Sequence, residues 1–368
     1  MEQCYQDRLH RVQQSLREAD LDFVFLTISP DLLYLTGYSS FVSERLTLLI
    51  IPPEGRSALV CPDFETGMVA HLAGEVDIIG WAESQNPVAL VCETLASLGC
   101  PSPRRIAVSD HAWAVFLLRF QAALPHTRFV PASCLLAPMR RVKDQGEVQI
   151  LKKAQDMAVE GFRQLLQQPF TGRTEKQVAA TLRHLFETLG FERVDVILVG
   201  SGPNGANPHL APTDRVIQHG DPVVIDFGAV HTGYYCDCTR TVHVGPPSDE
   251  FRKVFETVRR ANHAALAAIR PGVSCESIDR AARQVIEEAG YGRFFTHRLG
   301  HGIGLEVHEE PYMVEGNSLL LEPGMTFTNE PGIYLPGKFG CRLEDVVMAT
   351  ESGGAALTDY THELIIVD

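Results

Sequence analysis

Three features are scarce or missing in this sequence: positive charge, long apolar runs and paired cysteines. Lysine and arginine together number 32 against 46 aspartate and glutamate residues, and the net charge of −14 disfavours a nucleic-acid partner. No apolar run approaches the ~20 residues that a transmembrane helix needs, so no membrane association is expected. The nine cysteines are odd in number and form no C-x-x-C pair, which predicts a reduced, cytoplasmic setting.

The N-terminus also lacks the apolar core of a signal peptide. Residues 1–20 are studded with charged side chains, and apolar residues recur among them at helical spacing: Leu9, Val12, Leu16 and Ala19. With 368 residues, 45% of them hydrophobic and 21% charged, the chain has the composition of a globular protein and enough length for two domains.

The first part of the chain follows an α/β pattern. Its clearest helix is predicted at 111–123, and short buried strands are predicted at 23–27, 46–51, 58–61, 76–79 and 106–108. Ser29 and Gly37 have the residue types that cap a short helix between them. This part contains no cluster of ligand-type residues, so we expect a structural or oligomerisation domain.

A change of pattern between residues 136 and 145 predicts the domain boundary. Pro138 and a cationic run precede a stretch with helical apolar spacing, and the expected helices cover 148–165, 174–190, a segment from 251 that ends before Pro271, and 278–286. We therefore expect one domain at 1–138 and a second, α+β domain at 139–368. In the second domain the helices should lie outside a sheet that presents acidic residues.

The second domain is organised around a predicted hairpin that carries two aspartates. A β-branched run over 223–225 ends in Asp226, and a second β-like run after a turn carries Asp237. Because side chains alternate between the faces of a strand, a hairpin can place both carboxylates on one face and turn Cys236 and Cys238 to the other. Two buried carboxylates are costly without a positive partner, and a metal ion would supply one.

Three further residues have the chemistry of metal ligands. His301 lies in a glycine-rich run at 300–304, Glu330 in Thr-Asn-Glu-Pro-Gly, and Glu344 in Arg-Leu-Glu-Asp. Four carboxylates and one imidazole are enough for two metal ions. Oxygen-rich donors with a single imidazole suit hard or borderline cations such as Mn²⁺, Co²⁺ or Zn²⁺. Two such ions roughly 3.5–4 Å apart can generate a nucleophile at neutral pH.

These motifs, in their order and spacing from about residue 141 to the C-terminus, resemble those of the pita-bread metallopeptidases of family M24. That family includes Xaa-Pro dipeptidases (prolidases), aminopeptidase P and methionine aminopeptidase, with creatinase as a non-peptidase relative. The first domain, with Tyr-Leu-Thr-Gly at 34–37, resembles the creatinase-type N-terminal domain of the proline-directed members. The resemblance implies a creatinase-type α/β domain followed by a pita-bread catalytic domain, and a homodimer.

By this resemblance, five residues hold two divalent metal ions, with manganese the expected metal. Asp226 would bind one ion, and Asp237 and Glu344 would bridge both. His301 and Glu330 would complete the coordination of the second ion. Glu330 would also move a proton from the attacking water to the leaving nitrogen.

The resemblance also assigns residues to an Xaa-Pro peptide substrate. His209 and His308 match imidazoles that contact the substrate and stabilise the tetrahedral intermediate. His297 matches a histidine that lines the proline pocket of aminopeptidase P. The alternative is that His297 only supports a metal ligand by a hydrogen bond. Arg342, predicted to share a strand face with Glu344, would bind substrate, orient Glu344 or form a structural ion pair.

One departure from the family pattern bears on specificity. Several dipeptidases carry an arginine near the position of Tyr312, and a tyrosine cannot make the bidentate contact of an arginine to the substrate's terminal carboxylate. That contact would then pass to another arginine, such as Arg298 or one on a partner subunit, or the specificity would not be strictly that of a dipeptidase.

The length of the chain favours a dipeptidase over the longer aminopeptidases P, which remain the main alternative. A creatinase-like hydrolase and a non-catalytic binding module on the same fold are the rivals from other classes. Retention of all five ligand residues argues against both.

Overall fold

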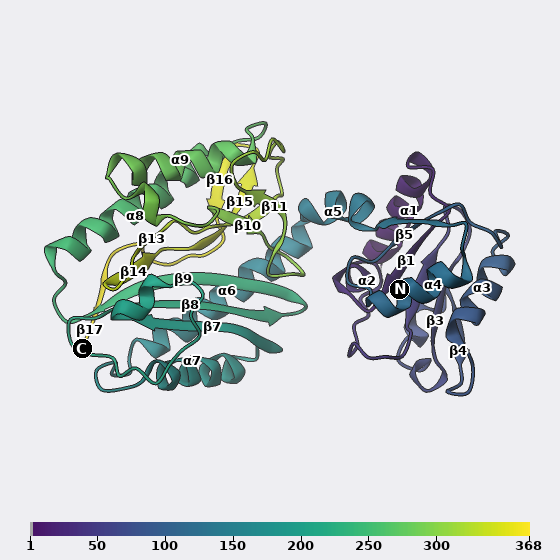
Figure 1. Cartoon of the computed structure of the whole chain (residues 1–368), viewed down its shortest axis with the longest axis horizontal. Coiled ribbons are helices and arrows are strands. Elements are labelled where there is room, and N and C mark those ends of the chain that lie inside the picture. The colour runs from purple at the N-terminus through teal and green to yellow at the C-terminus, as the bar shows by residue number, and fades with distance from the viewer. Residues whose placement is uncertain (1–2) are drawn as a thin grey trace. The chain divides into compact units, whose positions relative to one another are not determined.

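The computed structural model describes residues 3–368 and divides the chain into two compact units, Met1–Arg140 and Arg141–Asp368 (Figure 1). The division falls in α5 (Ser133–Arg141), inside the segment where the sequence pattern changes. Helices and strands alternate in the first unit and are mixed in the second, as the α/β and α+β patterns predict.

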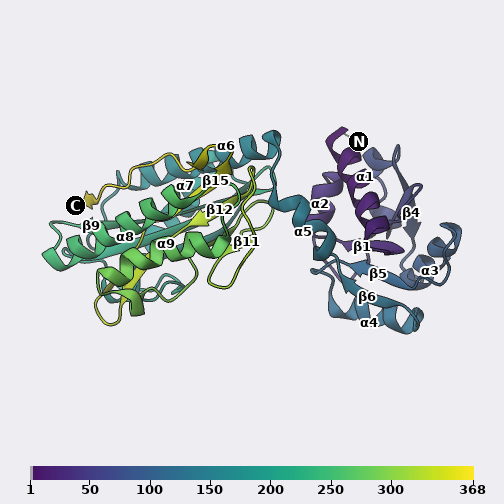
Figure 2. The same ribbon diagram turned by 90° about the horizontal axis from the view of Figure 1, so that it is seen from above.

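The first unit is built on a six-stranded mixed sheet. Its strands lie in the order β4 (Val76–Trp81), β3 (Ser57–Pro62), β2 (Leu48–Ile51), β1 (Phe23–Thr27), β5 (Arg105–Val108) and β6 (Arg128–Pro131). Strand β2 runs antiparallel to both of its neighbours, and the other pairs are parallel. The helices around the sheet are α1 (Gln3–Glu18), α2 (Pro30–Thr36), α3 (Pro87–Ser97) and α4 (Ala114–Ala123) (Figure 2).

Helix α2 begins and ends where the sequence predicts. The Ser29 hydroxyl accepts a hydrogen bond from the Leu32 amide at 3.3 Å, and Gly37 ends the helix with a φ of +70°. That left-handed conformation suits glycine because it has no Cβ. In α1, Leu9, Val12 and Leu16 form the buried stripe, as their helical spacing predicts.

The second unit contains two sheets and a short hairpin. The first sheet has the order β17 (Ile365–Val367), β9 (Tyr234–Val244), β8 (Pro222–His231) and β7 (Arg193–Ser201). The second has the order β11 (Glu309–Met313), β10 (Gly300–Gly302), β12 (Thr326–Asn329), β15 (Asp345–Thr350) and β16 (Gly353–Ala356). The hairpin pairs β13 (Gly332–Leu335) with β14 (Phe339–Arg342).

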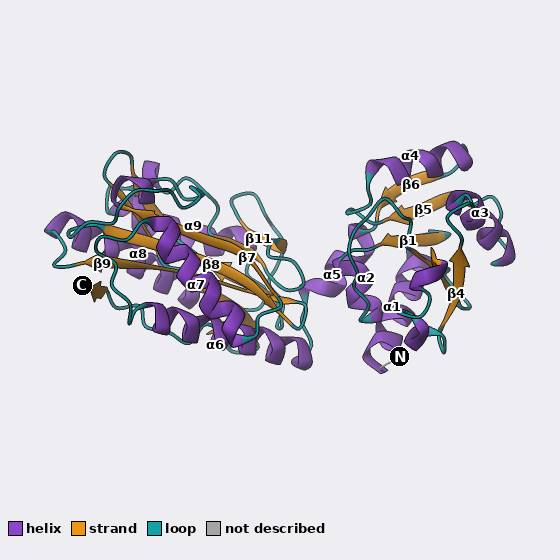
Figure 3. Cartoon of the chain, turned by 90° about the horizontal axis from the view of Figure 1, so that it is seen from below, coloured by secondary structure: helices purple, strands orange, loops and turns teal. Residues whose placement is uncertain are grey.

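A pair of helices covers each sheet of this unit. Helices α6 (Gln145–Leu165) and α7 (Glu175–Leu189) pack on the first sheet (Figure 3), and α8 (Asp249–Ala268) and α9 (Cys275–Glu288) on the second. Both α6 and α7 start with a complete capping box, Asp144 with Glu147 and Thr174 with Gln177. The apolar stripes of the helices form two separate cores, one behind each sheet.

Some elements differ from the sequence prediction. Strands β6 and β7 were not predicted, the helix expected from residue 111 begins at Ala114, and the strand expected from residue 46 begins at Leu48. Strand β7 alternates in burial along part of its length, so its period of two was a usable signal. Within residues 3–368, no helix has both the length and the apolar character needed to cross a membrane.

Backbone contacts of β9 join the first sheet of the second unit to segments beside the second sheet. Thr239 of β9 pairs with Glu344, and the Glu344 amide donates to the Thr239 carbonyl at 3.1 Å. Both side chains are buried. Residues from both sheets therefore face one another at this seam, where the acidic motifs of the sequence come together.

Candidate metal centre

Strands β8 and β9 form the predicted hairpin and set two aspartates on one face. Asp226 lies opposite Thr239, and Gly228 opposite Asp237, so Asp226 and Asp237 are diagonal neighbours. Cys236 and Cys238 point the other way, into the core beneath α6 and α7, as strand alternation predicts.

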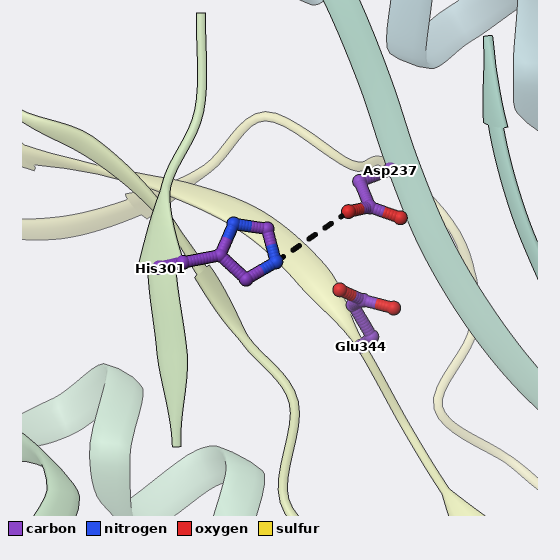
Figure 4. Close-up of side chains that lie close together, drawn as sticks. All are labelled: Asp237, His301 and Glu344. Carbon is purple, nitrogen blue, oxygen red and sulfur yellow. Dashed lines mark ion pairs between the residues drawn. The ribbon is translucent and has the colours of Figure 1, made fainter. Parts of the chain in front are cut away.

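Asp237 meets residues of the second sheet in a compact cluster. Ligand atoms of Asp237, His301 and Glu344 all lie within 4.8 Å of one another (Figure 4). His301 Nε2 is 3.6 Å from Asp237 Oδ2 and 3.5 Å from Glu330 Oε1. His301 Nδ1 lies 3.1 Å from the carbonyl of Gly302, so this nitrogen carries the proton and the Nε2 lone pair faces the carboxylates.

Thr328 of β12 connects two members of the cluster. Its hydroxyl donates to Glu330 Oε1 at 3.1 Å and accepts from the His301 amide at 3.1 Å. Strand β10 must approach β12 closely for this, and Gly300 allows it, since a Cβ at 300 would lie 1.8 Å from the Thr328 carbonyl oxygen. The glycine-rich motif around His301 therefore serves a steric requirement of the site.

Arg342 is the cation at the floor of the cluster. Its Nη2 lies 2.6 Å from Asp226 Oδ2, its Nε donates to Thr239 Oγ1 at 3.0 Å, and its Nη1 donates to the Tyr334 hydroxyl at 2.9 Å. The Thr239 hydroxyl in turn donates to Glu344 Oε2 at 2.5 Å.

One part of the sequence interpretation of Arg342, the strand shared with Glu344, needs correction. Arg342 ends β14 and Glu344 lies before β15, so the two residues do not share a strand. The direct ion pair of Arg342 is with Asp226, and Arg342 reaches Glu344 only through Thr239. Both residues nevertheless line the same cavity, and the hydrogen bond from the Glu344 amide to the Thr239 carbonyl holds Glu344 at the seam.

Burial shapes the protonation of this cluster. Burial and the neighbouring carboxylates raise the pKa of Asp237 and of Glu344 well above the usual range. Burial raises the pKa of Glu330 to about 7, although Arg342 opposes the shift. Burial and nearby His308 lower the pKa of His301 to about 3, which keeps the imidazole neutral and its lone pair available.

The donor set fits divalent metal ions. Four carboxylates line the same cavity. Among residues 3–368, Arg342 is the one cation that pairs directly with any of them, through Asp226. When all four carboxylates are ionised, the cluster therefore carries an excess of buried negative charge. Such charge is stable only when it is paired or bound to metal. Asp226, Asp237, His301, Glu330 and Glu344 could hold the ions, and an oxygen-rich set with one neutral imidazole suits hard or borderline cations.

The cluster forms the base of a cavity of about 590 Å³. All nine residues singled out from the sequence line it: His209, Asp226, Asp237, His297, His301, His308, Glu330, Arg342 and Glu344. His209 and His308 are exposed, and the ring of His308 lies 4.0 Å from that of His301 between centroids. His297 Nε2 lies 2.8 Å from the Tyr334 hydroxyl, which joins it to Arg342.

Sequence comparison identifies the family. The family model for metallopeptidase family M24 matches residues 149–351, and that for the creatinase/prolidase N-terminal domain matches residues 8–142. The chain belongs to metallopeptidase family M24.

Individual relatives of this M24 metallopeptidase cover its whole length. A Mycobacterium tuberculosis protein named as a probable dipeptidase PepE is 39% identical over 99% of this chain and 97% of its own. The structure of a prolidase from Thermococcus sibiricus matches with a TM-score of 0.94, 34% identity and full coverage of both chains. The structure of an X-Pro aminopeptidase from Thermotoga maritima matches with a TM-score of 0.84 and 32% identity, covering 96% of this chain and 100% of its own.

Sequence reasoning missed several residues that shape the site of this M24 metallopeptidase. Val196 and Leu198 of β7 and Val307 give the cavity an apolar wall. Thr239 and Thr328 hold the carboxylates by hydrogen bonds. The alternation of β7 could have revealed its two wall residues, but no local pattern marks the two threonines, because their partners are distant in sequence.

Proposed function

We propose that this M24 metallopeptidase hydrolyses the Xaa-Pro bond of dipeptides, using two divalent metal ions, with manganese as the resident metal. The main support is the convergence of four carboxylates and a neutral histidine at the base of one cavity. The dipeptidase and prolidase names of full-length relatives agree with this proposal. A cavity of about 590 Å³ is in the usual range for a small-molecule site.

The ligand set would be Asp226, Asp237, His301, Glu330 and Glu344. When bound, the two ions would polarise the scissile carbonyl and lower the pKa of the attacking water. The side chains of the protein would carry out proton transfer and substrate binding. The carboxylate of Glu330, whose side chain is 14% exposed at the cavity, would take the proton of the attacking water and pass it to the proline nitrogen.

Three histidines would contact the substrate. His209 and His308 are exposed at the cavity, where their N–H groups would donate hydrogen bonds to the carbonyl oxygen as it gains negative charge. His297 is held by Tyr334, and burial lowers its pKa to about 4, so it would present a neutral face to the proline ring. Val196 and Leu198 supply the apolar surface that a pyrrolidine ring requires.

Arg298 supports a dipeptide substrate over a longer peptide. It lines the cavity, and its guanidinium stacks over the ring of Tyr312 at 4.4 Å, with no carboxylate partner among the described residues. A dipeptide has a free carboxylate one residue beyond the scissile bond, and a guanidinium can bind it with charge-assisted hydrogen bonds. Arg298 would thus take over the role that Tyr312 cannot perform.

The proposal extends to the setting of the enzyme. None of the nine cysteines, each of which lies within the described residues, forms a disulfide. That supports a cytoplasmic enzyme. A homodimer is proposed from the family resemblance of the sequence, and sedimentation velocity of the purified protein tests it.

The function is tested with Ala-Pro and Ala-Pro-Ala as substrates for protein stripped with a chelator and reloaded with Mn²⁺, Co²⁺ or Zn²⁺. We expect Ala-Pro to be cleaved with a higher kcat/KM, and Mn²⁺ to restore the activity. Preference for the tripeptide would establish an aminopeptidase. No cleavage of either peptide by fully metal-loaded protein would refute a prolyl peptidase of any kind.

A further inference from the structure

A buried carboxylate outside the cavity holds both ends of the loop that carries His209. Glu175, the first residue of α7, is 0% exposed and accepts six hydrogen bonds. The donors are Ser201, Asn204 and Thr213. These three residues flank His209 on either side along the chain.

The contacts at each end of the loop are specific. The Ser201 amide and hydroxyl both donate to Glu175 Oε1 at 2.7 Å, at the point where β7 ends. The Thr213 amide and hydroxyl donate to Oε2 at 2.9 and 2.6 Å, at the far end. The Asn204 amide group spans both oxygens at 3.0 and 3.1 Å. One carboxylate thus closes the 201–213 segment into a loop.

Arg215 strengthens the closure without touching the carboxylate. Its Nη1 donates to Ser201 Oγ at 2.6 Å, and the same guanidinium pairs with Asp221 at 2.6 and 3.0 Å. Hydrogen bonds from Ser201 and Thr213 lower the pKa of Glu175 although burial opposes them, so the acceptor stays ionised. A charged acceptor binds its donors more strongly than a neutral one does.

On the cavity side the loop has contacts of its own. The Pro208 carbonyl accepts from Arg342 Nη1 at 3.5 Å, and Gly205 lies so close to β14 that a Cβ on Gly340 would be 1.8 Å from the Gly205 carbonyl oxygen. The loop therefore lies between Glu175 on one side and the floor of the metal centre on the other. Its path fixes where His209 stands relative to that floor.

We propose that Glu175 is a positioning residue, which sets the place of His209 in the cavity by closing the 201–213 loop. This inference rests on the proposed function of His209 as a substrate contact. Glu175 itself does not line the cavity and touches no substrate. A shift of about 1 Å in a contact group can cost roughly 100-fold in rate, so closure of the loop at both ends would protect the rate by keeping His209 in place.

The test compares Glu175→Gln and His209→Ala, alone and combined, with Asp31→Asn as the control. Asp31 is a buried carboxylate of the other unit, paired with Arg140 at 2.8 Å. We expect Glu175→Gln alone to lower kcat on Ala-Pro by at least about tenfold, with metal content unchanged. In the His209→Ala background, the same change should lower kcat by less than about a further twofold. Asp31→Asn should lower stability and leave kcat unchanged.

Equal kcat losses from Glu175→Gln in both backgrounds, or an unchanged kcat, would overturn the proposal. A second measurement does not depend on the catalysed reaction. Hydrogen exchange of the amides at 202–212 should be faster in Glu175→Gln than in wild type or Asp31→Asn. Unchanged exchange there would refute the closure by Glu175, even if the protein proved not to be a prolyl dipeptidase.

Discussion

The guanidinium of Arg342 lies 2.6 Å from the carboxylate of Asp226, and only 3% and 13% of the two side chains are exposed. This pair connects the floor of the site to the first sheet. Arg342 also donates a hydrogen bond to Thr239, whose hydroxyl binds Glu344 next to the second sheet, so one side chain reaches both Asp226 and, through Thr239, Glu344. Arg342 is therefore a built-in counter-ion that limits repulsion among the carboxylates when no metal is bound.

The first prediction concerns Arg342→Met in the metal-free protein. Removing one partner of a buried ion pair leaves an uncompensated charge, and we expect a loss of about 3–5 kcal/mol in the free energy of unfolding. Bound metal replaces the lost positive charge, so the loss should be smaller in the loaded protein. Urea unfolding with and without a chelator measures both values, with Arg342→Lys as the charge-retaining control. Equal losses in the two states would contradict this account.

The second prediction separates metal ligands from substrate contacts. Asp237→Ala removes a carboxylate that faces both His301 and Glu344, and should abolish turnover together with metal binding. His209→Ala removes an exposed imidazole on a loop and should retain metal while lowering kcat by about 100-fold or more, the usual effect of losing one donor to a developing oxyanion. Elemental analysis of the dialysed proteins checks both. Metal loss from His209→Ala would contradict the division.

The third prediction tests Arg298 as the receptor of the substrate carboxylate. Losing a charge-assisted hydrogen bond costs about 1.5–3 kcal/mol, so Arg298→Ala should lower kcat/KM for Ala-Pro by roughly 10- to 100-fold. The same change should hardly affect Ala-Pro amide, which has no terminal carboxylate. Tyr312→Phe is the matched control, because it keeps the ring that Arg298 stacks on. Similar losses on the acid and the amide would exclude this role.

The hairpin and the helices were predictable from local sequence. Asp226 and Asp237 lie in paired strands along which side chains alternate between the two faces, and the caps of α2 and α7 are signalled by Ser29, Gly37 and Thr174. Family resemblance then supplied His301, Glu330 and Glu344, which no periodicity connects to the hairpin. Their convergence with Asp237 follows from the seam between two sheets, a long-range feature.

Contacts between distant segments were not predictable in this way. The pairing of Arg342 with Asp226 joins residues 116 positions apart, and Thr239 hydrogen-bonds to Glu344 across 105. The prediction that Arg342 and Glu344 share a strand was wrong, because β14 ends at Arg342 and the next strand begins only at Asp345. A single sequence contains no signal for which buried polar side chain will meet which.

The fourth prediction concerns the close approach of β10 and β12. A Cβ at Gly300 would lie 1.8 Å from the Thr328 carbonyl oxygen, a backbone atom that cannot move aside cheaply. Gly300→Ala should therefore displace His301 from Glu330, destabilise the fold by about 1–3 kcal/mol as overpacking does, and reduce metal affinity. Gly67→Ala is the control, since a Cβ there meets nothing within 4 Å. Normal metal affinity in Gly300→Ala would show that β10 and β12 can move apart without displacing His301 from Glu330.

The last prediction follows from the lowered pKa of Glu175, which hydrogen bonds from Ser201 and Thr213 produce against the effect of burial. A folded-state pKa below the unfolded value of about 4.3 means that the ionised group stabilises the fold above that pH. This contribution is lost as the pH falls from about 4.3 through the folded pKa. With hydrogen bonds to a charged acceptor at about 1.5–3 kcal/mol each, Glu175→Gln should lose about 3 kcal/mol or more near pH 7.

The pH dependence of that loss is the decisive measurement. Denaturant unfolding in the presence of a chelator, from pH 7 to pH 3, measures the free energy of unfolding of both proteins. The difference between wild type and Glu175→Gln should stay constant down to about pH 4.5 and should become smaller below it. The other carboxylates titrate in both proteins, so their effect cancels in the difference. A gap that stays constant to pH 3 would mean that Glu175 holds the 201–213 loop by shape and not by charge.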